Sequence, residues 1–445
     1  MFKKYQTFLY ALIFLVFLLY AHSNHPLNSD EGIILDGAWN MLNGRKLYID
    51  FFEIITPGSF FAIFLSWKIF GASYLVAKFI SVFFVWLSVI GVYKICVLFS
   101  HKKWTYLAPF IFGSLSISWP IINHNSHSIL FVIWAVYFLL RALEIKKRKY
   151  FVLLGVFTAF LILFLQSKGV IFLVGVFLYL IFLWFYKKII PGKQIVYYIL
   201  PAIAISIAVL SFWPLDIIYS DLVIVPTTRY IRINTVSLWM FFIFVLWFVF
   251  LWFVYRRNQD IKIKALLLIQ ALLLFSSLSR PDHYHLSLNI FPILVLTGYF
   301  LAGDGRKELK IFYATYSVVL IVLLLMPSVM TFIIRSPLSI NKPISLVEKI
   351  KDNCEEIYAG PFLPGIYFET RKLNPGPYYS LFTDFNYPWH FAEQAEAVKK
   401  IRPDCAVLDY GMVSKFGYDK NNPLDNFIAE HYEESSMDRI WFYKD

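Results

Sequence analysis

The sequence carries little charge for its length. Only 16% of its 445 residues are charged, whereas 59% are hydrophobic and 20% are aromatic. Soluble domains contain about a quarter charged residues, so this composition excludes an ordinary water-soluble domain. The mean hydropathy is +0.62, and the hydrophobic residues form long blocks such as Phe151 to Leu165 and Met240 to Val254. With a few flanking residues, such blocks cross a hydrocarbon core about 30 Å thick.

Two further features are missing from the sequence. The basic and then hydrophobic N-terminus has no clear small-residue cleavage site, so we interpret it as a retained first membrane helix. A Gly-rich phosphate loop is also absent, which argues against a nucleotide site.

The hydrophobic blocks predict eleven membrane-spanning helices. They lie near residues 5–22, 75–99, 104–120, 128–144, 150–166, 169–186, 195–213, 236–255, 265–279, 287–302 and 311–334. Alternate loops between them hold clusters of Lys and Arg, which accumulate on the cytoplasmic side of membrane proteins. The net charge of +12 is therefore a topology signal and does not indicate nucleic-acid binding. We expect a multi-pass cell-membrane protein with a cytoplasmic N-terminus and an extracytoplasmic C-terminus.

One apolar stretch, Gly58 to Gly71, does not fit this count. It is too short to span a bilayer, and counting it as a span would place every later basic loop on the wrong side. We therefore expect it to lie along the outer surface as a juxtamembrane helix.

The predicted outer segments contain most of the acidic residues and nearly all the histidines of the membrane part. Polar groups at membrane depth are costly and usually mark a site or a water-filled cavity. We therefore predict one shared cavity at the outer face. The five segments are residues 23–74, 122–128, 166–169, 214–235 and 279–286.

The first outer segment contains a predicted amphipathic helix. Ser29 or Asp30 can cap its N-terminus, and Gly44 can end it. Its apolar positions follow a helical period: Ile34, Leu35, Ala38, Trp39 and Leu42. The Asp30–Glu31 pair then lies at the positive end of the helix dipole, where the two carboxylates could simply stabilise the helix. Their place beside the predicted cavity, followed by Asp50 and Glu53, favours a role in chemistry.

The order of motifs in this segment resembles a known family. The Asp-Glu pair follows the first predicted span, and the "G-x-x-x-Y-x-D" stretch, a proline and an "F-G" turn follow in turn, at Gly44/Tyr48/Asp50, Pro57 and Phe70-Gly71. This order resembles the start of the polyprenyl-phosphate-sugar-dependent glycosyltransferases of the GT-C fold. In particular, it resembles the group of the protein O-mannosyltransferases, aminoarabinose transferases and RgtA/B/C/D-like proteins.

Two later segments extend the resemblance over most of the membrane part. Arg280, Asp282 and His285 resemble the group's Arg-x-Asp-x-x-His segment, and Lys168-Gly169 resembles its outer Lys-Gly step. The resemblance implies a polytopic α-helical protein of the GT-C type with outer juxtamembrane helices. Its partners would be a polyprenyl-phosphate-linked sugar, a glycan, glycolipid or protein acceptor, and membrane lipids.

The implied reaction is an inverting sugar transfer to an acceptor hydroxyl. A base must take the hydroxyl proton, and Asp30 is our candidate. The leaving polyprenyl phosphate gains negative charge, so cations and hydrogen-bond donors must face it. The candidates for donor or phosphate binding are Glu31, Lys168, Arg229, Arg232, Arg280, His283 and His285. The candidates for sugar or acceptor contacts are Asp50, Glu53, His124, His127, Gln166 and Asp282.

Some of these residues have simpler interpretations. Arg229 and Arg232 could be interfacial side chains that reach toward lipid headgroups. Many members of the group carry a second acidic residue in the second outer loop, where this chain has Asn123, His124, Asn125 and His127, so that role stays unassigned. Pro57 is followed by Gly and not by a second Pro. Two histidines without a matching carboxylate are a weak metal signal, so a divalent cation is allowed but not indicated.

The chain changes character at about Ser336. Strand-like pieces at 356–360, 405–410 and 439–445 alternate with helix-like pieces at 345–353, 391–401 and 423–432. This alternation predicts a small α/β domain. We expect a membrane domain over 1–335 and an extracytoplasmic domain over 336–445. Acceptor binding, covering the cavity and plain structural support are all open as roles for the second domain.

Two of the three cysteines, Cys354 and Cys405, adjoin predicted strands of this domain, whereas Cys96 falls in a membrane helix. If the strands are parallel neighbours, their starts share one sheet edge and the cysteines come within reach of a bridge. Disulfides persist outside the cytoplasm, so we predict a Cys354–Cys405 disulfide. Two independent small apolar residues are the alternative.

Two other functions are compatible with the pattern. A ligase that moves a whole glycan from a lipid diphosphate would also use outer Arg and His residues, although the early Asp-Glu pair favours a monosaccharide transferase. A lipid or sugar carrier would need no chemistry. Carriers often show inverted repeats and midplane polar sites, and neither is visible here.

Overall fold

A computed structural model describes residues 2–302, 315 and 346–444, apart from 24–26, 28, 101–102, 119, 231–244, 246, 250, 253, 257–258, 279, 281–282, 412, 414–416 and 438. The chain forms two compact units. The first comprises Met1–His25, Lys78–Phe212 and Val236–Ser336, and the second comprises Pro26–Ala77, Trp213–Thr235 and Pro337–Asp445. The first outer loop and the C-terminal region therefore fold together in one unit.

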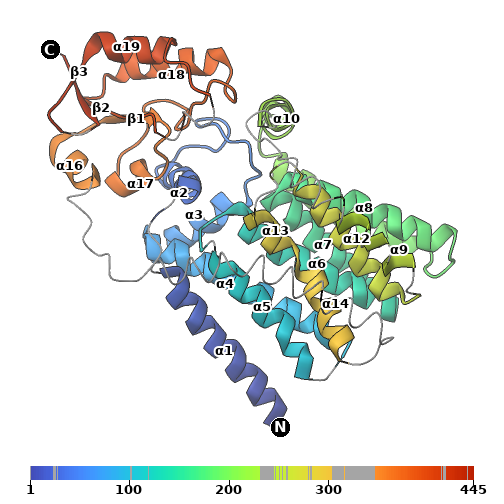
Figure 1. The fold of residues 1–445 in the computed structure, drawn as a ribbon. Helices are drawn as coiled ribbons and strands as arrows, with labels where there is room; N and C mark the ends of the chain where they lie inside the picture. The colour runs from blue at the N-terminus through green and yellow to red at the C-terminus, as the bar shows by residue number, and fades with distance from the viewer. Residues whose placement is uncertain are drawn as a thin grey trace. The chain divides into compact units, whose positions relative to one another are not determined.

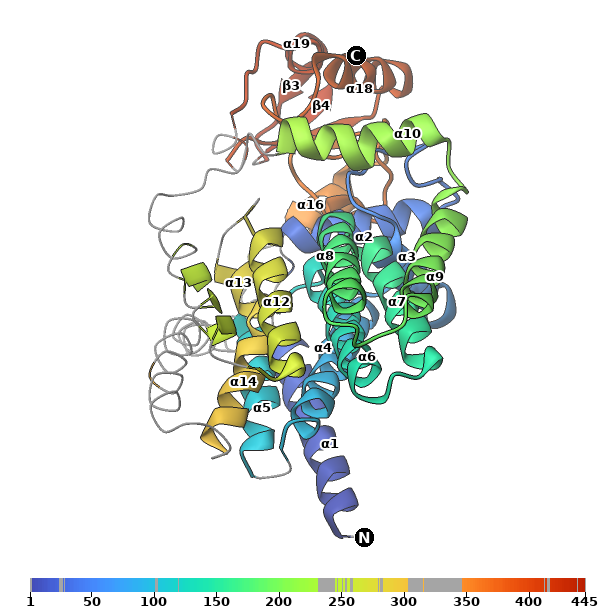
Figure 2. The ribbon, with the colours of Figure 1, turned by 90° about the vertical axis from the view of Figure 1, so that its right-hand side faces the viewer.

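The first unit is helical (Figures 1 and 2). Its elements within the described residues are α1 (Phe2–Ser23), α4 (Tyr74–Val97), η1 (Lys103–Tyr106), α5 (Leu107–Leu115), η2 (Ser116–Ser118), α6 (His124–Ile145), α7 (Arg148–Phe164), α8 (Gln166–Phe185), α9 (Lys193–Leu210), α12 (Ile261–Ser276), α13 (His283–Asn289) and α14 (Phe291–Leu301). Four of the described helices, α4, α6, α8 and α9, are long and apolar enough to cross a membrane. The predicted spans near 236–255 and 311–334 lie largely outside the described residues, so the count of eleven stays a prediction.

Two predicted spans differ in detail from the structure. The block at 104–120 begins and ends in short 3-10 turns around α5. The block at 287–302 is divided into α13 and α14 at Ile290. Pro292 lies in the first turn of α14, where a missing backbone N–H costs nothing, so it starts a new helix.

Close backbone contact joins the helices α7 and α9. A Cβ atom at Gly155 of α7 would lie 2.2 Å from the carbonyl oxygen of Tyr198 in α9. Small residues permit such approach between membrane helices. The other side of α9 presents apolar side chains to the surroundings, with Leu200 64% and Ile207 62% exposed. A stripe of this kind suits lipid contact, because it would be unfavourable in water.

The second unit combines helices from the first outer loop with a small sheet. Its elements within the described residues are α2 (Ser29–Leu42), α3 (Gly58–Phe70), α10 (Leu215–Tyr219), the π-helical turns η3 (Ser220–Ile224) and η4 (Pro226–Tyr230), α16 (Leu346–Asn353), β1 (Ile357–Pro361), α17 (Ile366–Thr370), α18 (Pro388–Ile401), β2 (Cys405–Asp409), α19 (Pro423–His431), β3 (Tyr432–Glu434) and β4 (Ile440–Tyr443). The helices predicted at 29–42 and 58–71 are thus present. Gly44 follows α2 with φ +86°, a conformation that favours glycine.

The sheet has the strand order β1-β2-β4-β3. β1 and β2 are parallel, with Ile357 opposite Cys405, and the other pairs are antiparallel. The three predicted strands and the predicted α/β character are confirmed, whereas β3 and α17 were not predicted. Helices α18 and α19 lie over one face of the sheet, and α16 and α17 lie over the other (Figure 1).

Candidate active site

The Asp30–Glu31 pair lies in the first turn of α2, as predicted, but the two carboxylates have different surroundings. Glu31 is fully buried, and its Oε2 accepts a hydrogen bond from the Tyr74 hydroxyl at 2.9 Å. Asp30 is only partly buried. A substrate can therefore reach Asp30 more readily than Glu31, whose carboxylate is held inside the unit.

A third carboxylate of α2, Asp36, is fully buried and was missed by the sequence analysis. It accepts hydrogen bonds from the backbone amides of Gly365 (2.6 Å) and Phe368 (2.9 Å). Burial raises its pKa from 3.8 to about 7, against the lowering effect of the two amides. The sequence signal was weak, because Asp36 sits among apolar residues of α2 and its partners are more than three hundred positions away.

Glu53 and Asp50, both predicted to contact the sugar or acceptor, differ in environment. Asp50 is exposed and accepts a hydrogen bond from the Lys46 amide (2.6 Å), which stabilises the turn after α2. Glu53 is 4% exposed, and its Oε1 has no hydrogen-bond partner among the described residues. Burial and the nearby Asp221 raise the pKa of Glu53 well above its usual value. Burial also raises the pKa of Asp221 to about 6.

Arg229, a candidate phosphate ligand, stacks on an aromatic side chain. Its guanidinium carbon lies 4.2 Å from the centre of the Tyr387 ring, a favourable cation–π geometry. Tyr387 in turn stacks on Trp389, with an interplanar angle of 9°. Arg232 and Asp282 lie outside the described residues, as does the side chain of His283.

The first unit brings together candidates from three different outer segments. The Asn125 side-chain amide donates to Nε2 of His124 at 3.0 Å and to Nε2 of His285 at 3.1 Å. Lys168 and Arg280 lie close enough to His124 to interact with it electrostatically. The second, third and fifth predicted outer segments therefore converge, and Asn125 is a member of the group that sequence analysis did not select.

Lys168 is the most buried cation of this group. It lies in the first turn of α8, beside the half-buried Gln166, and is 4% exposed. The next residue, Gly169, permits this position, since a Cβ there would lie 2.5 Å from the Cα of Ile162. The structure shows no hydrogen bond or ion pair of Lys168 with any described residue. A buried ammonium of this kind suits an anionic ligand, because an uncompensated buried charge is costly.

His127 has a separate place, deeper in the helix bundle. It is fully buried in α6, and its Nε2 forms a 2.7 Å hydrogen bond with the Ser81 hydroxyl of α4. One turn earlier in α4, the buried Lys78 donates to the Pro120 carbonyl. Lys78 was also missed, although a lysine within the hydrophobic block that forms α4 is an unusual residue.

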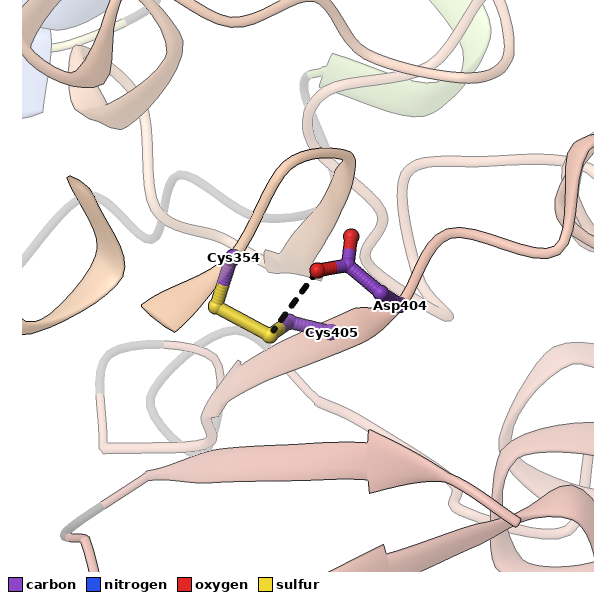
Figure 3. Close-up of side chains that lie close together, drawn as sticks. All are labelled: Cys354, Asp404 and Cys405. Atoms are coloured by element: carbon purple, nitrogen blue, oxygen red, sulfur yellow. Dashed lines mark hydrogen bonds between the residues drawn. A yellow bond between two sulfur atoms is a disulfide. The ribbon is translucent and has the colours of Figure 1, made fainter. Parts of the chain in front are cut away.

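The predicted pairing of Cys354 and Cys405 is present in the structure, with Cα atoms 5.8 Å apart (Figure 3). The bridge joins the residues before β1 and at the start of β2. Asp404 beside it accepts hydrogen bonds from the amides of Glu355 and Glu356. Among the described residues, these three side chains form the only group of three possible metal ligands. Because both sulfurs are bonded to each other, the group does not fit a metal ion.

Residues 55–213 match the model of the dolichyl-phosphate-mannose-protein mannosyltransferase family. The structure is similar to that of ArnT from Cupriavidus metallidurans bound to undecaprenyl phosphate, with a TM-score of 0.62, 13% identity, and coverage of 98% of this chain and 97% of that chain. It is also similar to the oligosaccharyltransferase of Archaeoglobus fulgidus, with a TM-score of 0.55, 12% identity, and coverage of 97% and 73%. None of the curated proteins matches the sequence.

The fold and the family model together define the class. The chain is a membrane protein with the GT-C fold, and the family resemblance inferred from its sequence motifs is confirmed. Its particular relatives in structure, ArnT and the archaeal oligosaccharyltransferase, share about an eighth of their residues with it, so their likeness defines the fold alone.

Proposed function

We propose that this chain is a membrane glycosyltransferase that moves one sugar from a polyprenyl-phosphate carrier to an acceptor hydroxyl at the outer membrane face. The convergence of Lys168, Arg280 and His285 carries the proposal, because it gathers cations and imidazoles from separate loops around one place. The family model over residues 55–213 and the similarity to ArnT with its bound undecaprenyl phosphate support it.

In the proposed reaction the acceptor oxygen attacks the anomeric carbon of the donor. The bond between that carbon and the phosphate oxygen breaks, and the anomeric configuration inverts. Asp30 takes the hydroxyl proton, since it is the more exposed carboxylate of the pair. Glu31, which accepts a hydrogen bond from Tyr74, holds the first turn of α2 in place.

The departing polyprenyl phosphate carries more negative charge than the donor did. Lys168 supplies a point charge and Arg280 can supply two parallel hydrogen bonds to phosphate oxygens. A low-dielectric surrounding makes such contacts stronger than they are in water. His285 and His124 are placed to donate hydrogen bonds to the phosphate or the sugar. Glu53 is buried, and its Oε1 has no partner within the described part of the chain, so it is a candidate contact for an acceptor or sugar hydroxyl.

The transfer of a whole glycan from a lipid diphosphate is a second candidate function, which the similarity to an oligosaccharyltransferase supports. Both functions need outer cations, and they differ in the leaving group and in the size of the transferred glycan. A carrier or flippase would leave every glycan unchanged.

Mass spectrometry of surface glycans tests the proposal in cells. Cells that contain the protein should carry one additional monosaccharide on a glycan, glycolipid or protein, and cells that lack it or carry Asp30→Asn should not. An added oligosaccharide block would favour the ligase. Identical glycans in all three strains would reject a transferase.

A further inference from the structure

Segment 363–372 of the C-terminal region packs directly against α2, the helix that carries Asp30 and Glu31 (Figure 1). Both belong to the second unit. The contact is polar at its centre, where both carboxylate oxygens of the buried Asp36 accept backbone amides, Oδ2 from Gly365 and Oδ1 from Phe368. The two oxygens of one buried carboxyl group thus bind two backbone amides of the same segment, which holds α2 and the segment in one register.

Gly32 of α2 brings the two backbones into van der Waals contact. A Cβ atom at this position would lie 2.2 Å from the carbonyl oxygen of Pro364 and 2.5 Å from the amide nitrogen of Gly365. Both of these neighbours are backbone atoms, so no side chain could move aside. The contact lies one residue after Glu31 and therefore acts on the first turn of α2.

The other end of α2 is attached to the same segment. The Trp39 indole donates to the carbonyl of Lys372 at 2.8 Å. The guanidinium of Arg371 lies 5.0 Å from the Trp39 ring centre and donates to the Ala72 carbonyl. Phe368 stacks on Trp67 of α3 at 4.6 Å. The segment therefore contacts both helices of the first outer loop, at three successive points of α2.

We propose that segment 363–372 is a positioning element for the catalytic helix α2, and that Asp36 and Gly32 are its positioning residues. The inference rests on the proposed function, because it concerns where Asp30 is held. It also assigns a role to the C-terminal region. Ile366, Tyr367, Phe368 and Thr370 are all buried, so this part of the region supports the site and does not present a surface to an acceptor.

A positioning role makes a distinctive prediction for kinetics. Displacing α2 moves the base away from the acceptor hydroxyl, which lowers the turnover number, whereas the phosphate contacts assigned to Lys168 and Arg280 stay in place. Misplacement of a reacting group by about 1 Å can cost about 100-fold in rate. We expect Asp36→Asn and Gly32→Ala to lower turnover by at least about tenfold, with affinity for polyprenyl phosphate within about twofold of the wild type.

Hydrogen exchange of the full-length protein in lipid nanodiscs tests the contact between α2 and segment 363–372 independently of activity. Peptides over 29–42 and 363–372 should exchange about 10- to 100-fold faster in both variants. Peptides over β1 and β2 should exchange as in the wild type, which shows that the sheet is folded. Asp352→Asn, which removes an exposed carboxylate of α16, is the matched control and should leave exchange and turnover unchanged.

The outcomes separate this inference from the proposed function. If the wild type transfers no sugar, the proposed function fails, and the exchange data still report on the contact. If the wild type transfers sugar while both variants exchange and turn over normally, the positioning role is wrong. Faster exchange of α2 with unchanged turnover also overturns it, because the contact would then be structural only. We expect Asp36→Glu to lower turnover as much as Asp36→Asn does, because the fully buried position has no room for a longer side chain.

Discussion

The two units of this molecule bury charges of opposite sign. In the first unit the buried candidates are Lys168 and His127, with the half-buried His124, Arg280 and His285. In the second unit they are carboxylates, Glu31, Asp36 and Glu53, with the partly buried Asp30 at the start of α2. The difference suggests a division of tasks: cations for a leaving phosphate in the first unit, and carboxylates for a proton and for hydroxyl groups in the second.

Two of the buried carboxylates of the second unit, Glu31 and Asp36, have hydrogen-bond partners within their own unit. Glu31 accepts from Tyr74, and Asp36 accepts from two amides, whereas the structure shows no bond of Lys168 with a described residue. A buried ionic group without a partner is costly, and such groups cluster at functional sites. Lys168 is therefore the residue at which an external anion would change the energetics most.

Asp30→Asn should have the largest effect. An amide cannot take the proton of the acceptor hydroxyl, so transfer should fall by about 10²- to 10⁴-fold, the usual contribution of a general base. Binding of polyprenyl phosphate should stay as in the wild type. A radiolabelled-sugar transfer assay and a lipid-binding assay on the same preparation measure both, and near-normal transfer would remove Asp30 from the mechanism.

Neutral substitutions of the cations in the first unit should weaken donor-lipid binding, which Asp30→Asn should leave unchanged. Lys168→Met and Arg280→Met each remove a charge assigned to the phosphate, so affinity for polyprenyl phosphate should fall by about 10- to 100-fold. Lys193→Met is the control, because Lys193 is exposed at the start of α9. Unchanged affinity in Lys168→Met and Arg280→Met would break the proposed division between the units.

These candidates show which parts of the fold and of the candidate site can be predicted from the sequence alone. Lys168, His124 and His285 were selected because polar residues among apolar blocks stand out. The structure joins His124 and His285 through Asn125, and Lys168 lies close enough to His124 to interact with it electrostatically. The helices at 29–42 and 58–70 and the strands at 357–361, 405–409 and 440–443 follow from local sequence patterns. The hydrogen bonds of Asp36 connect positions about 330 residues apart, and no local pattern encodes such a contact. β3 was missed because it follows α19 directly, with no turn residue between them.

The pH dependence of the second unit should be set in part by Asp36. An unfolded aspartate ionises near 3.8, whereas folded Asp36 ionises at about 7. The folded state therefore binds this proton more tightly, so the contact is most stable at low pH and weakens as pH rises from about 4 to about 7. The slope from this one group reaches about 1.4 kcal/mol per pH unit.

Exchange protection of peptide 363–372, corrected for intrinsic rates, measures this slope. Glu369, Glu53 and Tyr367 also face Asp36, so the comparison with Asp36→Asn isolates its share. The variant should show a shallower decline of protection between pH 4 and pH 7. Equal slopes in both proteins would mean that Asp36 does not ionise in this range.

Thiol labelling tests the side of the membrane on which the candidate residues lie. Single cysteines near Lys147, Arg257 and Lys307 should resist impermeant reagents in intact cells, whereas one near His283 should react. Labelling at the first three positions would overturn the eleven-span topology.

The last prediction concerns the disulfide and the number of free thiols. Because Cys354 and Cys405 are bonded in the structure and Cys96 is buried in α4, non-reducing denaturation should reveal one free thiol per chain. Three free thiols in the protein purified from membranes would place the second unit in a reducing compartment.

The central claim is transfer of one sugar with release of polyprenyl phosphate, and the stoichiometry of the purified protein tests it most directly. Lipid and glycan products would be counted by mass spectrometry after reaction of a polyprenyl-phosphate sugar with an acceptor extract. The account predicts one polyprenyl monophosphate released for each sugar added to acceptor, and neither product with Asp30→Asn. Release of a polyprenyl diphosphate, or movement of intact donor across the bilayer without any release, would contradict it.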